Sequence, residues 1–403
     1  MKRENKKFKK PNYFIYGILI LLSKIIAKVK FNLKIGKNEI KKLKGPYVVL
    51  ANHESSIDFI NLICCTNRRL SIVVSNSFYQ SLKINPLMKM CGVIPKQQFQ
   101  TTVSDMRKMK EAISANRHLA IYPAGLMTEN GLTTPIPEAT GKFIKWLGAD
   151  VYIAKTKGTY LTNPKWGKGM RKGKVTLDVT KFMSKEELKA YSTEELQKMI
   201  CEQLDYNAYK NQEIDMVEYK NGNDVRGLEN VLYWCPKCHK EFVINNENTS
   251  SLKCECCGNE VYADNYGFLN PKTEQDICYK HPSDWYNALY NELKEEVVKD
   301  DNYCLESQTM IKMLNYKKHT FEEVGSGVVK LSRDGFVING VIKGEEKEIK
   351  VAIKTLPILP FKPGVHFEIQ DGDIIYRCCL ENGKEVSKWI NVLKIFYELN
   401  KEI

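Results

Sequence analysis

The stretch YVVLANHESSIDFINL, residues 47–62, decides how the first part of this chain is expected to fold. Its apolar start has the length of a buried strand, and this strand would end just before Asn52. His53 follows at once, and Asp58 comes five residues after it. In open α/β sheets the loops at the carboxyl ends of strands carry the functional side chains, so this pair is a candidate site. The alternative is a helix N-terminus, with Asn52 or Ser55 as the cap and Asp58 as an acid that the helix dipole favours.

The sequence around this stretch alternates between short apolar runs and helical patterns. Such interleaving predicts an α/β domain in which helices pack on a largely parallel or mixed sheet. The expected strands are residues 46–51, 71–75, 118–122, 151–155 and 175–179, and the expected helices are residues 57–65, 85–91, 101–115 and 139–147.

Length and composition limit the possible classes of protein. The chain has 403 residues, of which 43% are hydrophobic and 27% are charged. These values predict two or three domains and exclude an intrinsically disordered chain. A formal net charge of +13 favours anionic partners, either nucleic-acid phosphates or membrane headgroups. The 13 cysteines are odd in number and mostly scattered, which indicates reduced cytosolic thiols rather than a secreted disulfide framework.

The N-terminus combines a basic segment with a short apolar run. MKRENKKFKK carries six cationic side chains and one Glu, and the apolar run that follows, residues 13–22, has ten residues. A spanning helix needs about 20 apolar residues, and lysines stand where a signal peptide would have its cleavage site. Residues 1–32 therefore predict a basic amphipathic anchor, peripheral or monotopic, at the cytoplasmic face of the cell membrane. The alternative is an ordinary core helix with a basic tail.

Four of the cysteines have the spacing of metal ligands. Two Cys-x2-Cys pairs separated by fifteen residues are typical of a ribbon in which two knuckles hold one Zn²⁺ through four thiolates. With no open coordination position, the zinc would be structural. Cys256 would be a spare thiol, His239 is not expected to be a ligand, and the alternative is four unrelated thiols. The expected ligands are Cys235, Cys238, Cys254 and Cys257.

The sequence from about residue 308 changes to alternating runs that predict antiparallel hairpins. They end in the helical pattern SKWINVLKIFYELNKE, whose apolar positions share one face around Trp389. Several strands followed by one C-terminal helix resemble a pleckstrin-homology-like barrel. Domains of this kind often bind lipids or peptides, but the fold alone does not establish this, and an accessory structural module is the alternative.

Four motifs together resemble a known family. Asn52-His53-x4-Asp58 after a strand resembles the first motif of the glycerophospholipid acyltransferases, the family that includes 1-acyl-glycerol-3-phosphate acyltransferase. GVIPKQQ at 92–98, IYPAGLMTENG at 121–131 and VYIAKTKG at 151–158 resemble the second, third and fourth motifs in the same order. The resemblance implies an acyltransferase domain, placed here at residues 33–230, and an enzyme similar to the lysophospholipid acyltransferases of phospholipid biosynthesis. The expected remainder is a zinc ribbon at 231–270, a helical linker at 271–307 and a PH-like β domain at 308–403.

The resemblance also implies roles for individual residues. Acyl transfer from a thioester to a hydroxyl needs a base, and a neutral imidazole is suited to it. His53 would take the hydroxyl proton, while Asp58 holds the other ring nitrogen. Their spacing is one residue too long for a helical i,i+4 pair, so we expect His53 in a loop and Asp58 in the first turn of the next helix. A backbone N–H near Gly125 is the expected oxyanion donor.

The acceptor site departs from the family pattern. Where the family has an Arg and a Glu that seat the acceptor and its phosphate, this chain has Gln98 and Ala124, and Met127 replaces a further Arg. Lys96 can supply a point charge but not a bidentate fork. The expected substrate-binding residues are therefore Lys96, Gln98, Ala124 and Gly125.

These observations predict a membrane-surface O-acyltransferase whose donor is acyl-CoA or acyl carrier protein and whose acceptor is a lysolipid or a related hydroxyl compound. Its partners would be membrane lipids and the acyl donor. The first alternative is a non-catalytic lipid-binding or regulatory protein that uses the same pocket. A nucleic-acid partner is permitted by the ribbon, the net charge and the basic stretch KWGKGMRKGK at 165–174. It is disfavoured because no basic strand with interleaved aromatic residues accompanies the ribbon.

Overall fold

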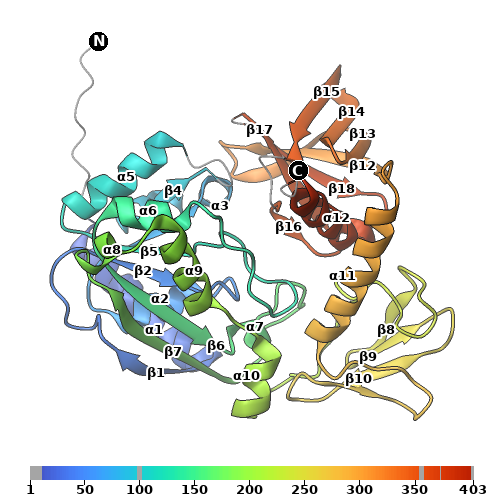
Figure 1. Ribbon diagram of the computed structural model, residues 1–403, viewed down its shortest axis with the longest axis horizontal. Helices are drawn as coiled ribbons and strands as arrows, with labels where there is room; N and C mark the ends of the chain where they lie inside the picture. Colours follow the sequence, from blue (N-terminus) through green and yellow to red (C-terminus); the bar gives the residue numbers. More distant parts are fainter. Residues whose placement is uncertain (1–10, 98–101, 354–357, 373, 401–403) are drawn as a thin grey trace. The chain divides into compact units, whose positions relative to one another are not determined.

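The computed structural model describes residues 11–97, 102–353, 358–372 and 374–400. The chain forms two compact units (Figure 1). The first is made of the residues up to Asn163 together with Arg171–Val217, and the second of Pro164–Met170 together with the residues from Glu218 on.

The first unit is built on a seven-stranded mixed sheet. Strand β1 is parallel to β7, β7 is antiparallel to β6, and the strands from β6 to β4 are all parallel. The central strand β2 is wholly buried between β5 and β6, and its last residue, Ala51, lies opposite Ala154. The sheet order is β1 (Asn32–Asn38), β7 (Lys174–Met183), β6 (Asp150–Lys157), β2 (Tyr47–Ala51), β5 (His118–Ile121), β3 (Leu70–Ser75) and β4 (Ile94–Lys96).

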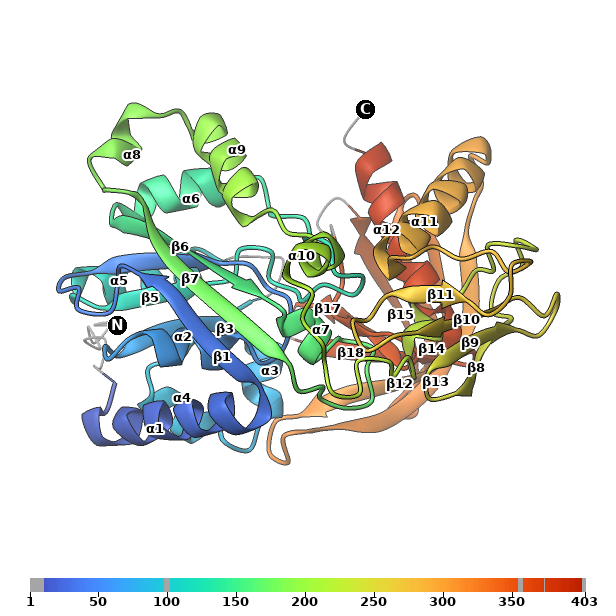
Figure 2. The same cartoon turned by 90° about the horizontal axis from the view of Figure 1, so that it is seen from below.

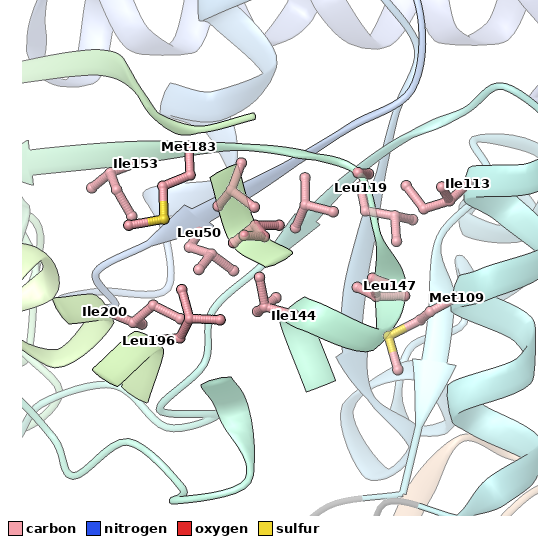
Figure 3. Close-up of a cluster of buried hydrophobic side chains, with 14 of the residues drawn as sticks. Leu50, Met109, Ile113, Leu119, Ile144, Leu147, Ile153, Met183, Leu196 and Ile200 are labelled. Atoms are coloured by element: carbon pink, nitrogen blue, oxygen red, sulfur yellow. The ribbon is translucent and has the colours of Figure 1, made fainter. Parts of the chain in front are cut away.

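Helices cover both faces of this sheet (Figure 2). Because successive strand side chains point to opposite faces, β2 contributes to two cores. Val49 packs with side chains of α1 and α2, whereas Leu50 packs with those of α5, α6, α8 and α9 (Figure 3). The helices of the first unit are α1 (Tyr13–Lys30), α2 (Asp58–Cys65), α3 (Asn76–Ser81), α4 (Asn85–Met90), α5 (Val103–Ser114), α6 (Thr140–Leu147), α7 (Thr159–Thr162), α8 (Glu187–Ala190), α9 (Thr193–Leu204) and α10 (Ala208–Asp215).

The predicted α/β class is confirmed, and each expected strand and helix of this unit is present with small changes at its ends. Strand β1 was not expected. Its sequence NLKIGKN has no apolar run, because it lies at the edge of the sheet and is mostly exposed. Its place in the sheet comes from parallel pairing with β7, more than 140 residues away in sequence.

The second unit contains a small ribbon, a long helix and an antiparallel β domain. The ribbon sheet has the order β11 (Leu269–Pro271), β10 (Glu260–Ala263), β9 (Ser251–Cys254) and β8 (Ile244–Asn248). The β domain has the order β15 (Glu345–Ala352), β14 (Gly335–Ile342), β13 (Thr320–Ser332), β12 (Leu305–Asn315), β18 (Ile374–Leu380), β17 (His366–Asp371) and β16 (Phe361–Lys362). The helical segments are η1 (Leu228–Asn230), α11 (Pro282–Lys299), η3 (Gly383–Glu385) and α12 (Val386–Leu399).

Helix α11 lies in the segment that the sequence suggested as a linker, and it is packed on both sides. Trp285 and Leu289 belong to the ribbon core together with Cys235. Further along the helix, Lys294 Nζ forms an ion pair with Glu398 Oε2 of α12 at 2.7 Å. The ribbon and the β domain therefore share α11 as a structural element.

Candidate functional site

The candidate site begins where β2 ends. The side chain of Asn52 pairs with the backbone of Thr156 on β6: its Oδ1 accepts from Thr156 N at 2.9 Å, and its Nδ2 donates to Thr156 O at 2.8 Å. These bonds continue the β2–β6 pairing by one position with a side chain in place of a peptide. The start of the following loop is thereby fixed to the sheet.

His53 and Asp58 form a hydrogen-bonded pair in this loop. His53 Nδ1 lies 2.9 Å from Asp58 Oδ2, and the same oxygen accepts from the backbone N–H groups of Glu54 at 2.8 Å and Ser55 at 2.9 Å. Asp58 is the first residue of α2, and its side chain is 1% exposed, against 21% for His53. The two backbone bonds fix this oxygen, and its contact with Nδ1 holds the ring so that Nε2 is the nitrogen left for a substrate.

This geometry answers the question of a cap against a catalytic pair. The N-cap position of α2 is Ile57, and no side chain caps the helix there. Asn52 bonds to Thr156, and Ser55 Oγ donates to Asn163 O at 2.7 Å, so neither acts as the expected alternative cap. The loop-then-helix placement predicted for the pair is the one observed, while its catalytic role stays a prediction.

The loop after β5 holds His53 from its other side. The rings of His53 and Tyr122 stack with centroids 4.4 Å apart and an angle of 29° between planes. The N–H of Thr128 donates to His53 O at 3.2 Å. Burial, with a smaller contribution from the charge of Asp58, raises the pKa of Tyr122 well above its usual range, so its hydroxyl is neutral. The imidazole is therefore oriented by the end of one strand and by the loop after its neighbour.

A pocket opens beside His53. Polar and apolar side chains both line its walls. The lining residues are Ala51, Asn52, His53, Glu54, Pro123, Ala124, Thr128, Leu132, Thr133, Thr134, Ile136, Leu204 and Tyr206.

Glu54 is a site residue that the sequence analysis missed. Its side chain is buried, where Oε1 accepts from Asn52 Nδ2 at 2.7 Å and Oε2 accepts from Thr159 Oγ1 at 2.9 Å and Tyr160 N at 3.1 Å. Burial and the nearby charge of Asp58 raise the pKa of Glu54 from 4.5 to about 8. An acid next to the histidine was the available signal, but its partners on α7 lie about 105 residues away.

The expected acceptor residues are only partly brought together. Ala124 lines the pocket, whereas Lys96 does not. Lys96 is half-buried at the end of β4, where burial lowers its pKa and the charge of Asp105 partly offsets this. Gln98 lies outside the described residues.

The oxyanion donor expected near Gly125 stays a prediction, but the amide of Gly125 itself is bonded elsewhere. Gly125 is exposed, does not line the pocket and donates its N–H to Tyr122 O at 3.0 Å across a turn. Its φ of +69° explains the glycine, because this turn needs a left-handed backbone. This amide is therefore committed to the turn rather than offered to an oxyanion.

The thiols of the second unit form a compact cluster. Cys235 Sγ lies 3.7 Å from Cys257 Sγ, and Cys238 Sγ lies 3.7 Å from Cys254 Sγ. All four sulfurs lie within 4.8 Å of one another. Ligands about 2.3 Å from a tetrahedral zinc would have sulfurs about 3.8 Å apart, so the cluster can hold a metal ion of this kind.

The two knuckles are equivalent in backbone geometry. His239 N donates to Cys235 O at 2.9 Å, and Gly258 N donates to Cys254 O at 3.0 Å. Both residues have a positive φ, which is natural for Gly258 and less common for His239. His239 Nδ1 instead bonds Glu292 Oε2 at 2.9 Å, and Cys256 is exposed, so both lie outside the cluster as expected.

The match to a known protein family lies mainly in the first unit. Residues 32–167 match the family model described as Acyltransferase. This segment is therefore similar to the acyltransferase family, and the resemblance of the four motifs is confirmed. A comparison with curated proteins finds no match.

Among solved structures, the chain is similar to the 1-acyl-sn-glycerophosphate (LPA) acyltransferase PlsC from Thermotoga maritima. The identity is 16% and the TM-score 0.43, over 50% of this chain and 80% of that one. Similarity at this level carries no inference about the acceptor. In the described residues, no helix has the length and apolar character needed to cross a membrane.

Proposed function

We propose that this protein is a membrane-surface O-acyltransferase that moves a fatty acyl group from a thioester donor to a lysolipid or related hydroxyl acceptor. The observation that carries the proposal is the 2.9 Å bond between His53 Nδ1 and Asp58 Oδ2 at the wall of a pocket in a domain similar to the acyltransferase family. The donor is acyl-CoA or acyl carrier protein, and the acceptor itself supplies the nucleophilic oxygen.

The proposed reaction needs one base and one orienting carboxylate. As the acceptor oxygen attacks the thioester carbonyl, His53 Nε2 takes the hydroxyl proton, and Asp58 stabilises the imidazolium that forms. The tetrahedral intermediate then collapses, the carbon–sulfur bond breaks, and the imidazolium returns the proton to the thiolate. The backbone N–H groups of Glu54 and Ser55 hold the Asp58 carboxylate in place throughout the reaction.

The membrane location is supported by an unusual packing of α1. Its buried positions include Ser23 and Ala27, whereas Leu21, Ile25 and Val29 are exposed. With 3.6 residues per turn, the exposed set forms one stripe and the buried set lies on the opposite face. A helix that buries Tyr16 with two small residues and presents large apolar side chains on its opposite face suits the boundary between headgroups and acyl chains.

For the thiolate cluster we propose structural Zn²⁺, because four thiolates in two equivalent knuckles leave no open coordination position. When bound, the ion would fix the ribbon that is too small to have a large core of its own.

The test of the catalytic proposal is acyl transfer by His53→Ala and Asp58→Asn, measured with several lysolipids and one acyl donor. Loss of the base should lower kcat by about 10²-fold or more, and Asp58→Asn should do the same by releasing the ring. The melting temperature of His53→Ala should change little, since this side chain lies at the edge of a loop. Full activity of His53→Ala would exclude the mechanism. If wild type transfers no acyl group but still binds lysolipid, the non-catalytic alternative is correct.

A further inference from the structure

A second apolar surface lies beside α1. In the segment from α3 to α4, Phe78 is 48%, Ile84 is 55%, Leu87 is 46% and Met90 is 45% exposed. Single exposed apolar residues are common, but a group of them within fifteen residues of chain requires an explanation.

This surface is linked to the start of α1 by a backbone hydrogen bond. Asn12, the N-cap of α1, donates its backbone N–H to the carbonyl of Met90, the last residue of α4, at 2.8 Å. Figure 2 shows α4 and α1 on the same side of the sheet. The two helices therefore present their apolar side chains from one layer of the first unit.

The charges around both helices have one sign. The segments 11–35 and 76–91 contain no Asp or Glu. Exposed lysines accompany the apolar side chains in each segment: Lys24 and Lys28 lie on α1, Lys83 lies just before α4, and Lys89 lies on α4. Lysine is depleted in the cores of protein–protein interfaces, whereas lysines flanking apolar side chains suit anionic headgroups above acyl chains.

We infer that α4, with the end of α3, is a second membrane-docking element, and that its occupant is an anionic lipid bilayer. The inference rests on the proposed function and adds to it a second contact between the first unit and the membrane. Helix α4 ends in a tight turn in which Val93 N donates to Met88 O at 3.1 Å.

The experiment measures partition into phosphatidylcholine vesicles that contain phosphatidylglycerol. In Ile84→Glu/Leu87→Glu, two carboxylates replace side chains that would enter the acyl region, so we expect binding to weaken by about tenfold or more, or about 1.4 kcal/mol. The matched control is Ile214→Glu/Val298→Glu, which makes the same charge change at two exposed apolar positions on α10 and α11. It should weaken binding less than twofold. Leu21→Glu/Ile25→Glu on α1 gives the reference for the first element.

A second measurement does not depend on affinity. The fluorescence of Leu87→Trp should be quenched by lipids brominated on the acyl chain more strongly than that of Ile214→Trp, after subtraction of the wild-type signal. Equal quenching, or unchanged partition of a folded Ile84→Glu/Leu87→Glu protein, would overturn the inference. A wild-type dimer that this double variant converts to a monomer with unchanged vesicle binding would show instead that the surface binds a second copy.

The same variants separate this inference from the catalytic proposal. With a short-chain acceptor kept monomeric in solution, Ile84→Glu/Leu87→Glu should retain the wild-type rate, whereas His53→Ala should not. If the wild type shows no acyl transfer in any assay, the catalytic proposal fails while the partition measurements still decide whether α4 docks. If α4 proves not to dock, acyl transfer by the wild type leaves the catalytic proposal standing.

Discussion

The His53–Asp58 pair and the four-thiol cluster are both small constellations of polar side chains, but they are held in different ways. The pair comes from one loop, and Asp58 is fixed by backbone N–H groups of that loop before any ligand arrives. The thiols come from two knuckles with fifteen residues between them, and backbone N–H groups of each knuckle bond the sulfurs of Cys235 and Cys254. Four thiolates at such distances repel one another unless a cation lies between them.

This difference predicts that the pair contributes to catalysis and the thiol cluster to stability. Removing a group from the pair should lower the rate of acyl transfer and leave the fold intact, because its neighbours remain bonded to the sheet. Removing a ligand from the cluster should lower the stability of the second unit and leave the chemistry of the first unit intact.

The largest effect is expected from removal of the metal ligands in the second unit. Purified protein should contain about one Zn²⁺ per chain, and Cys235→Ser or Cys257→Ser should abolish its binding. Because structural zinc contributes on the order of 10 kcal/mol in small domains, the ribbon should unfold. Metal analysis and thermal melting test this, with Cys256→Ser in the same knuckle as the matched control that keeps its zinc. Loss of acyl transfer on a monomeric acceptor in Cys235→Ser would break the separation between the two regions.

A smaller effect should come from Glu54 and concerns pH. Its folded-state pKa of about 8 lies above the ordinary 4.5, so between these values the folded protein keeps a proton that the unfolded chain releases. The stability of the first unit should therefore be greatest below about pH 4.5 with respect to this group and fall as the pH rises toward 8. One pKa unit corresponds to about 1.4 kcal/mol, so the loss amounts to a few kcal/mol.

The measurement is thermal and denaturant unfolding across this pH range for wild type and Glu54→Gln. The variant should lose the decline between pH 4.5 and 8, while Glu138→Gln, at an exposed glutamate of the same unit, should retain it. Parallel declines in all three proteins would mean that Glu54 does not titrate in this window.

The smallest expected effect concerns the acceptor. A phosphate monoester at a water-depleted site needs fixed cationic donors, and Lys96 lacks the bidentate geometry of Arg. Acyl transfer to lysophosphatidic acid should therefore be about tenfold slower than to the best neutral or zwitterionic lysolipid, which corresponds to about 1.4 kcal/mol. The test is a comparison of rates with one acyl donor.

Two further outcomes sharpen this prediction. Lysophosphatidic acid as the best acceptor by tenfold would show that cations from elsewhere replace the missing Arg. Gln98→Arg with Ala124→Glu should raise activity on lysophosphatidic acid, whereas Ala124→Glu alone should not, because it adds a negative charge without the cation.

The sequence allowed accurate prediction of features that depend on local pattern. The buried run of β2, the placement of His53 before a helix that begins at Asp58, and the thiol spacing are all properties of short segments. Features that depend on distant partners were not predictable. The bonds of Glu54 to Thr159 and Tyr160 join segments about 105 residues apart, and β1 takes its place only through pairing with β7.

Helix α1 lies between these cases. Its apolar run was evident, but a run with large side chains on every side does not reveal which face is buried. The burial of Ser23 and Ala27 depends on packing against other parts of the first unit, including α2, which the α1 sequence alone does not specify. The amide of Gly125 is a similar case. The motif predicts a turn, but it does not predict which carbonyl accepts the N–H of Gly125.

The segment Pro164–Met170 has a consequence for how the protein is made. It belongs to the second unit, although it lies in the chain between β6 and β7 of the first. Trp166 is part of the second unit's core, and a Cβ on Gly227 would lie only 2.0 Å from its carbonyl oxygen. During translation the first unit can close around this segment while the ribosome has yet to produce residues 218–403. The partners of Trp166 in the second unit's core are then synthesised after Trp166 itself. A gene fragment that starts at residue 218 would encode the second unit without this core tryptophan.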